Sequence, residues 1–155
     1  MKIEFMRAAI RLSLEKMRQG EGGPFGAGVV RRGKIVGRGW NRVTSANDPT
    51  AHAEIMAIRA ACKKLKTFRL DDCELYASSE PCPMCLAAIY WARIGGIFYA
   101  GARRDAAAAG FDDDLIYREI ARPVSRRKIP MRQLLHAGAL AVFQEWRDKP
   151  DKIRY

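Results

Sequence analysis

The 155-residue sequence lacks the features that would assign it to a membrane or secreted class. It contains no apolar run of about 18 residues, the length that a membrane-spanning helix needs. Its first seven residues carry charges every few positions, so they lack the continuous apolar segment of a secretion signal. No repeat, linker or low-complexity stretch divides the chain. We therefore predict one compact domain spanning residues 1–155, located in the cytoplasm and without a membrane partner.

Acidic residues are scarce beside basic ones. Asp and Glu number 17 against 28 Lys and Arg, which gives a net charge of +11. Basic clusters lie at residues 31–34, 63–66, 103–104 and 126–128. Such a charge could attract a polyanion such as RNA, but an ordinary solvated surface explains it more simply. An ordinary solvated surface is thus favoured over a surface that binds nucleic acid.

The hydrophobic pattern predicts an α/β protein. One apolar stripe indicates a first helix, formed by Ile3, Met6, Ile10, Leu14 and Met17. The expected elements then follow in order: strands 25–30 and 35–40 as a hairpin, a polar loop 41–47, a helix 51–65 capped near 48–50, a strand 75–79, a helix 83–92, a strand 97–100 and a last helix near 140–146. Strands that alternate with helices indicate crossover connections on one sheet.

Histidine and cysteine are also rare, and three of them have the pattern of a zinc site. Cys82 and Cys85 are three residues apart, so one helical turn brings both sulfurs to the same side. His52 and Cys82 each stand at the start of an expected helix, where the helix dipole favours a thiolate. Imidazole nitrogen and thiolate sulfur are the ligands that zinc prefers.

The two remaining cysteines lie too far away to complete a closed structural site. Cys62 is about 15 Å from His52 along the helix. Cys73 lies at the far end of its strand, about 20 Å away. Both are interpreted as core residues, and in a reducing compartment they do not form a disulfide framework. We therefore predict one Zn²⁺ per subunit, with water or hydroxide in its fourth position, which is typical of catalytic zinc.

Glu54 lies two residues after His52 and is the candidate catalytic acid–base. In a first helical turn, side chains lean back toward the N-terminus, so both can converge on one ligand. A carboxylate there can take a proton from activated water and return it to a leaving amine. His-x-Glu followed by Pro-Cys-x-x-Cys matches the signature of zinc nucleobase deaminases. A zinc-stabilised binding module without chemistry is the alternative, and it would need a fourth protein ligand.

Longer motifs carry a family resemblance. Residues 52–54 and 80–85 resemble the cytidine deaminase-like superfamily, and residues 22–27, 47–54 and 110–113 resemble its small bacterial guanine deaminases. The resemblance covers nearly the whole chain. It implies a three-layer αβα sandwich with a central mixed five-stranded sheet, and hydrolysis of guanine at C2 to xanthine and ammonia in purine catabolism or salvage. It also implies a homodimer that exchanges its C-terminal segment, so that Tyr155 closes the partner's site.

The resemblance assigns Asp113 to substrate binding and to a second proton transfer. Guanine presents N1–H and its 2-amino group as donors on one edge, and a carboxylate accepts from both. Asp112 and Asp114 are adjacent candidates. Capping of the helix expected near Leu115 would explain the acidic run without any substrate.

Four further residues are substrate-binding candidates: Asn41, which matches the family's base-binding asparagine, Phe25, Trp91 and, beside His52, Ala53. An asparagine amide both donates and accepts, as a purine edge requires, although Asn41 could equally serve the turn that follows its strand. Phe25 and Trp91 could stack on a base or could simply pack in the core. His136 has no neighbour with metal-ligand spacing and is interpreted as a non-ligand.

The nearest rival function is a tRNA adenosine deaminase of the same superfamily. Residues 48–54 occur in both groups and do not discriminate, whereas the net charge suits RNA. Residues 110–113 favour guanine, because adenine C6 presents no donor pair that matches guanine's. Deamination of another small amino-heterocycle, such as a cytosine-like ring, is the remaining alternative.

Overall fold

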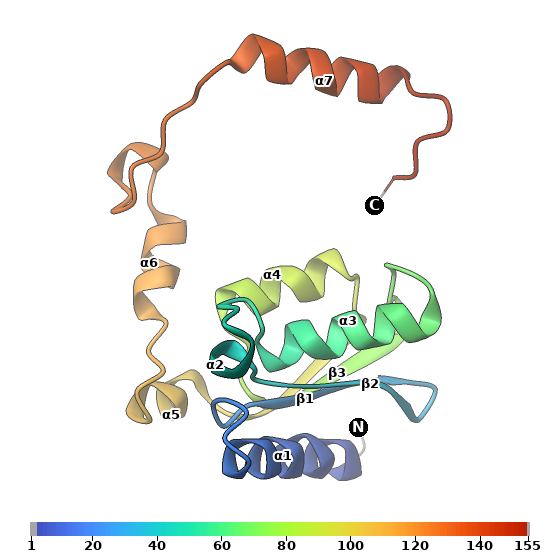
Figure 1. The fold of residues 1–155 in the computed structure, drawn as a ribbon, viewed down its shortest axis with the longest axis vertical. Coiled ribbons are helices and arrows are strands. Elements are labelled where there is room, and N and C mark those ends of the chain that lie inside the picture. Colours follow the sequence, from blue (N-terminus) through green and yellow to red (C-terminus); the bar gives the residue numbers. More distant parts are fainter. Residues whose placement is uncertain (1–2, 155) are drawn as a thin grey trace. The chain divides into compact units, whose positions relative to one another are not determined.

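The computed structural model describes residues 3–154, and its contacts divide the chain into two compact units. The first spans Met1–Asp113 and the second Asp114–Tyr155. Figure 1 labels the helices and strands of both units.

The N-terminal unit alternates helices and strands in the predicted order. Its elements are α1 (Ile3–Arg18), β1 (Gly26–Arg31), β2 (Lys34–Trp40), α2 (Val43–Ala46), α3 (Ala53–Leu65), β3 (Cys73–Ser79), α4 (Pro83–Trp91), β4 (Gly96–Gly101) and α5 (Arg103–Ala108). The short helix α2 lies in the segment expected to be a polar loop. Helix α3 begins at Ala53, because the Asp48 side chain accepts hydrogen bonds from Thr50 and forms a local turn, not a helix cap.

The sheet has the strand order β2-β1-β3-β4 and is mixed, as predicted. Strand β1 runs antiparallel to both β2 and β3, whereas β3 and β4 are parallel and joined through α4. The predicted fifth strand is wrong for the described residues, which form four. The chain after β4 enters the alanine-rich helix Arg103–Ala108 almost at once, and alanine favours helix over strand.

A two-residue turn fixes the β1–β2 hairpin. Arg32 and Gly33 both have positive φ, 48° and 72°, the combination that matches the twist of paired strands. Beside the turn, Arg31 Nε donates to Asp72 Oδ2 at 2.7 Å. The hairpin predicted from the sequence is therefore confirmed, and its register pairs Gly26 with Trp40.

Helices cover both faces of the sheet, with α1 on one face and α3 and α4 on the other (Figure 1). The buried core between the layers includes Val29, Leu75 and Ala57. Helix α3 lies so close to β2 that a Cβ at Gly39 would overlap the backbone oxygen of Ala53. Glycine in β2 thus sets the position of the first turn of α3.

Helix α1 is confirmed, but the apolar stripe that predicted it is not its buried face. Ile10, Leu14 and Met17 are 44%, 41% and 39% exposed, whereas Ala9 and Ser13 are buried. Small side chains on the inner face let the α1 backbone approach β1 closely. The face of α1 toward the sheet thus combines the small residues Ala9 and Ser13 with the half-buried Phe5 and Leu12.

The C-terminal unit contains α6 (Asp114–Ala121), the 3₁₀ turn η1 (Val124–Arg126) and α7 (His136–Asp148). Helix α7 includes the predicted helix near residues 140–146 and begins earlier, at His136. None of residues 114–154 is buried, and large apolar side chains such as Leu135 and Phe143 are 89% and 63% exposed. This unit has no core of its own among the described residues. No helix within residues 3–154 is long and apolar enough to cross a membrane.

Candidate active site

Two helix starts carry the predicted metal ligands. His52 is the N-cap residue of α3 and Cys82 the N-cap residue of α4, both with extended backbone. Neither side chain caps its own helix, so both remain available to a ligand. Cys85 lies in the first turn of α4 and is buried. The donor atoms of the three residues all lie within 4.8 Å of one another.

The spacing of these donors fits a zinc ion. His52 Nδ1 is 3.5 Å from Cys82 Sγ and 3.6 Å from Cys85 Sγ. Tetrahedral zinc with bond lengths of about 2.3 Å to sulfur and about 2.0 Å to nitrogen requires a nitrogen–sulfur separation of about 3.5 Å. The sequence prediction that these three residues converge is therefore met, in a geometry that could hold the metal.

The charge state of the thiols also suits a metal site. The pKa of Cys82 is lowered to about 4, because its sulfur accepts hydrogen bonds from the Cys85 thiol and from His52. The same hydrogen bond to Cys82, together with burial, raises the pKa of Cys85. The pKa of His52 is raised by its hydrogen bond with Cys82. One thiolate is thus already formed, and a metal would have to displace the proton of the second.

Cys62 and Cys73 do not join this group among the described residues. Cys73 is only 1% exposed within the core, and burial raises the pKa of its thiol to about 11. Cys62 packs against the same core, and burial raises its pKa as well. Both are poor metal ligands in these surroundings, in agreement with the prediction that they are core residues.

Glu54 lies beside the three candidate ligands. It is the second residue of α3 and only 7% exposed. The Cys85 thiol donates to Glu54 Oε2 at 3.3 Å, so the carboxylate and the metal-ligand group are in direct contact. Burial raises the pKa of Glu54, which brings it toward the range where a carboxyl group exchanges protons at neutral pH. Between His52 and Glu54, Ala53 begins α3 and is buried.

Asn41 follows β2 and is 8% exposed. Its Oδ1 accepts two hydrogen bonds, from Gly23 N–H and from Val43 N–H, both at 3.2 Å. The loop before β1 crosses this residue so closely that a Cβ at Gly22 would overlap the Asn41 backbone oxygen. The amide oxygen thus serves the local turn, as the alternative interpretation expected, and Nδ2 is the group left for a ligand.

An aromatic pair adjoins Asn41 through the same loop. Phe25 and Phe111 meet edge to face, with ring centroids 4.8 Å apart. Gly23 lies against both rings. Sequence reasoning missed Phe111, although it stands inside the motif 110–113 that carried the resemblance. Trp91 ends α4 and is 68% exposed, so core packing does not account for it.

The three neighbouring aspartates differ in their surroundings. Asp113 forms an ion pair with Arg103, Nε to Oδ1 at 2.9 Å, and its side chain is only 17% exposed. Asp114 pairs with Arg118 one turn along α6. Asp112 is exposed. Asp113 is therefore the least exposed of the three. Tyr155 lies outside the described residues, and the prediction made for it stays untested.

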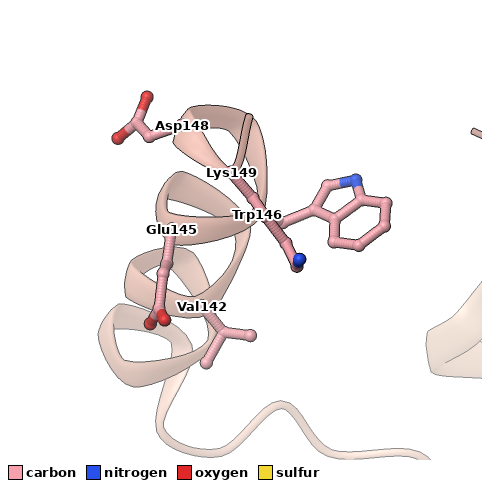
Figure 2. A pocket seen from close by; sticks show the side chains of 5 residues that line it. All are labelled: Val142, Glu145, Trp146, Asp148 and Lys149. Atoms are coloured by element: carbon pink, nitrogen blue, oxygen red, sulfur yellow. The ribbon is translucent and has the colours of Figure 1, made fainter. Parts of the chain in front are cut away.

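In the C-terminal unit, an open hollow of about 480 Å³ lies on α7 and is lined by Val142, Glu145, Trp146, Asp148 and Lys149. Figure 2 shows Trp146 and Asp148 projecting from opposite sides of the helix. The walls of the hollow come from α7 and its C-cap residue Lys149. Among the described residues, they carry no group with metal-ligand spacing. The hollow is a feature of the C-terminal unit taken by itself.

Residues 1–101 match the family described as the cytidine and deoxycytidylate deaminase zinc-binding region. The chain belongs to this family. The match includes all three candidate metal ligands and Glu54, so the His/Cys/Cys group and the family's description both indicate zinc. The family match ends before Arg103 and Asp113, so only the structure describes the surroundings of these two residues.

Relatives within the family differ in how much of the chain they match. A guanine deaminase of Bacillus subtilis is 53% identical over 97% of both chains. The crystal structure of a guanine deaminase from that species matches the whole chain with a TM-score of 0.96. A guanine deaminase structure from Nitrosomonas europaea has 31% identity and a TM-score of 0.68 over 94% of this chain and 84% of that one. A tRNA-specific adenosine deaminase of Aquifex aeolicus is 41% identical over 62% of this chain and 63% of its own.

Proposed function

We propose that this protein is a guanine deaminase, a zinc-dependent aminohydrolase that converts guanine and water to xanthine and ammonia. The observation that carries the proposal is the extent of the similarity. Identity with a guanine deaminase spans 97% of the chain, whereas identity with the tRNA-specific enzyme spans 62%. The chain beyond the shared zinc region thus resembles the guanine enzyme. A role in purine catabolism or salvage within the cytoplasm follows from that activity as part of the proposal.

The geometry around Glu54 supports the chemistry. A zinc ion held by His52, Cys82 and Cys85 would supply Lewis-acid activation of water. Glu54 takes a proton from the water molecule while the water oxygen forms a bond to C2 of guanine. It then delivers that proton to the exocyclic amine, the C2–N bond breaks, and ammonia leaves. The raised pKa of the buried Glu54 suits a group that must both accept and donate a proton near pH 7.

Substrate binding is assigned to residues around the aromatic pair. Asp113 accepts from guanine N1–H and from the 2-amino group and assists a second proton transfer, and Asn41 Nδ2 donates to an acceptor of the purine. Phe25, supported by Phe111, contacts the base. Ala53 and Trp91 line the same site in this proposal.

We further propose a homodimer in which the C-terminal segments are exchanged and Tyr155 closes the partner's site. Two properties of the C-terminal unit support it. None of the described residues 114–154 is buried, and its apolar side chains, such as Leu134 and Phe143, are 81% and 63% exposed. A segment of this kind needs another surface on which to bury them.

An RNA substrate is the second candidate, favoured by the net charge of +11 alone. A single screen separates the two: ammonia release by the zinc-loaded protein from guanine, guanosine, adenine, cytosine and a tRNA anticodon stem-loop, with Glu54→Gln as the inactive control. We expect release from guanine at least tenfold above any other substrate. Release from the stem-loop without release from guanine would reject the proposal in favour of the RNA enzyme.

A further inference from the structure

Arg103 is a residue to which neither the sequence motifs nor the zinc-binding region assigns a role. It is the first residue of α5, and its side chain is 36% exposed. Its neighbour Arg104 is 91% exposed and lies 3.8 Å from Asp105. The two adjacent arginines therefore have different surroundings: one is held inside the unit, and the other extends into solvent.

The backbone of Arg103 is tied to the loop that carries the metal ligands. Its N–H donates to Glu80 Oε2 at 3.0 Å. Glu80 N–H in turn donates to the Gly101 carbonyl at 2.8 Å, and Glu80 stands two residues before Cys82. The start of α5 is thus fixed relative to the start of α4 by two hydrogen bonds that do not involve the Arg103 guanidinium.

The side chain of Arg103 reaches the candidate substrate carboxylate. Its Nε forms an ion pair with Asp113 Oδ1 at 2.9 Å, and this oxygen is shielded from solvent and has no hydrogen-bond partner within residues 3–154. This contact restrains the Asp113 carboxylate, whose side chain is 17% exposed.

We propose that Arg103 is the positioning residue for Asp113: its guanidinium holds the carboxylate in the orientation in which it accepts from the amino-bearing edge of the base. The inference rests on the proposed guanine deaminase function. A planar guanidinium suits this task, because its N–H groups are rigidly directed and a carboxylate oxygen has more than one acceptor site. Arg103 does not touch the substrate in this scheme and acts through Asp113 alone.

The test compares Arg103→Met with Arg104→Met in the full-length zinc-loaded enzyme. Methionine keeps most of the side-chain length, and it leaves the backbone N–H that binds Glu80, so zinc content should be unchanged. We expect Arg103→Met to lower kcat/KM for guanine on the order of 10- to 100-fold, because a misoriented carboxylate loses the productive geometry. Arg103→Lys should recover part of that loss, and Arg104→Met should stay within about twofold of wild type.

A double-mutant cycle separates positioning from a structural effect. If Arg103 acts through Asp113, then Arg103→Met should cause no further loss in an Asp113→Asn background. Should turnover in that background be too slow to measure, the cycle is repeated with equilibrium binding of hypoxanthine, which has N1–H but no amine to release.

Three outcomes would overturn the inference: equal activities of the two methionine variants, an undiminished effect of Arg103→Met in the Asp113→Asn background, or a loss of bound zinc in Arg103→Met. Failure of the proposed function would look different, because the wild-type enzyme itself would release no ammonia from guanine.

Discussion

At the scale of single residues, burial gives Glu54 its predicted role. A carboxylate on the first turn of a helix is ordinarily exposed and ionised, since the helix dipole favours it there. Glu54 is instead 7% exposed and accepts from Cys85, and burial raises its pKa. We expect Glu54→Gln to lower kcat for guanine by roughly 10²- to 10⁴-fold, as loss of a general acid–base does. Steady-state ammonia release, with bound zinc measured in parallel, checks this.

The matched control for that substitution is Glu15→Gln on the exposed side of α1. It makes the same chemical change far from any candidate ligand and should leave kcat within about twofold of wild type. A Glu54→Gln enzyme that keeps its zinc and more than a third of wild-type kcat would show that another group moves the protons.

The two cysteine ligands predict how zinc binding depends on pH. At pH 7, Cys82 is already a thiolate because its pKa is lowered to about 4, whereas the raised pKa of Cys85 keeps that thiol protonated. The raised pKa of His52 also favours its protonated form. Zinc must displace these protons, so its apparent affinity should fall as the pH is lowered, and binding at pH 7 should release at least about one proton per ion.

Calorimetry of the metal-free protein in buffers of different ionisation enthalpy measures that proton release. Cys85→Ser should bind zinc more weakly and release fewer protons, whereas Cys62→Ser, a change outside the site, should behave as wild type. Zinc binding without proton release would mean that both thiols are ionised before the metal arrives.

At the scale of elements, the sequence predicted those parts that local chemistry determines. The sequence predicted that His52 and Cys82 stand at the starts of two helices, and both residues are N-caps in the structure. The hairpin followed from a turn that contains Gly33. The apolar stripe predicted the helix α1 but not its buried face, because the close approach of Ala9 and Ser13 to the sheet depends on β1. The pairing of Arg103 with Asp113 was not predicted for the same reason: ten residues and the end of a helix separate them.

A glycine in β2 controls where α3 begins, and this can be tested. At Gly39, an added Cβ would overlap backbone atoms of Ala53 and Ala57, which cannot move without displacing the helix that carries Glu54. We expect Gly39→Ala to lower the free energy of unfolding by about 1–3 kcal/mol, the range for overpacking, and to weaken zinc binding. Urea denaturation and zinc titration measure both effects.

Gly28→Ala is the matched control for Gly39→Ala. It lies on the neighbouring strand, and an added Cβ there meets only Gly37 O at 3.8 Å, an ordinary contact distance. Its effect on stability should stay below about 1 kcal/mol, since glycine is itself unfavourable within a strand. Equal destabilisation by the two variants would show that the spacing of β2 and α3 is not the determining contact.

At the scale of the whole molecule, the N-terminal unit has a sheet, a core and a metal-ligand group of its own, whereas the described C-terminal residues bury nothing among themselves. If the C-terminal segments are exchanged between two chains, each active site draws its zinc ligands and Glu54 from one chain and Tyr155 from the other. Two inactive variants should then complement each other. One carries Glu54→Gln with an intact C-terminus, and the other lacks Tyr155 but keeps Glu54.

After the two proteins are mixed, unfolded and refolded together, half of the dimers are mixed, and each mixed dimer has one complete site. Guanine deamination should therefore recover to about a quarter of the wild-type rate, because symmetric pairing is statistical. Refolding each variant separately gives the baseline. If every site were built from a single chain, no pairing of these two variants could complete one, and the mixture would remain at that baseline.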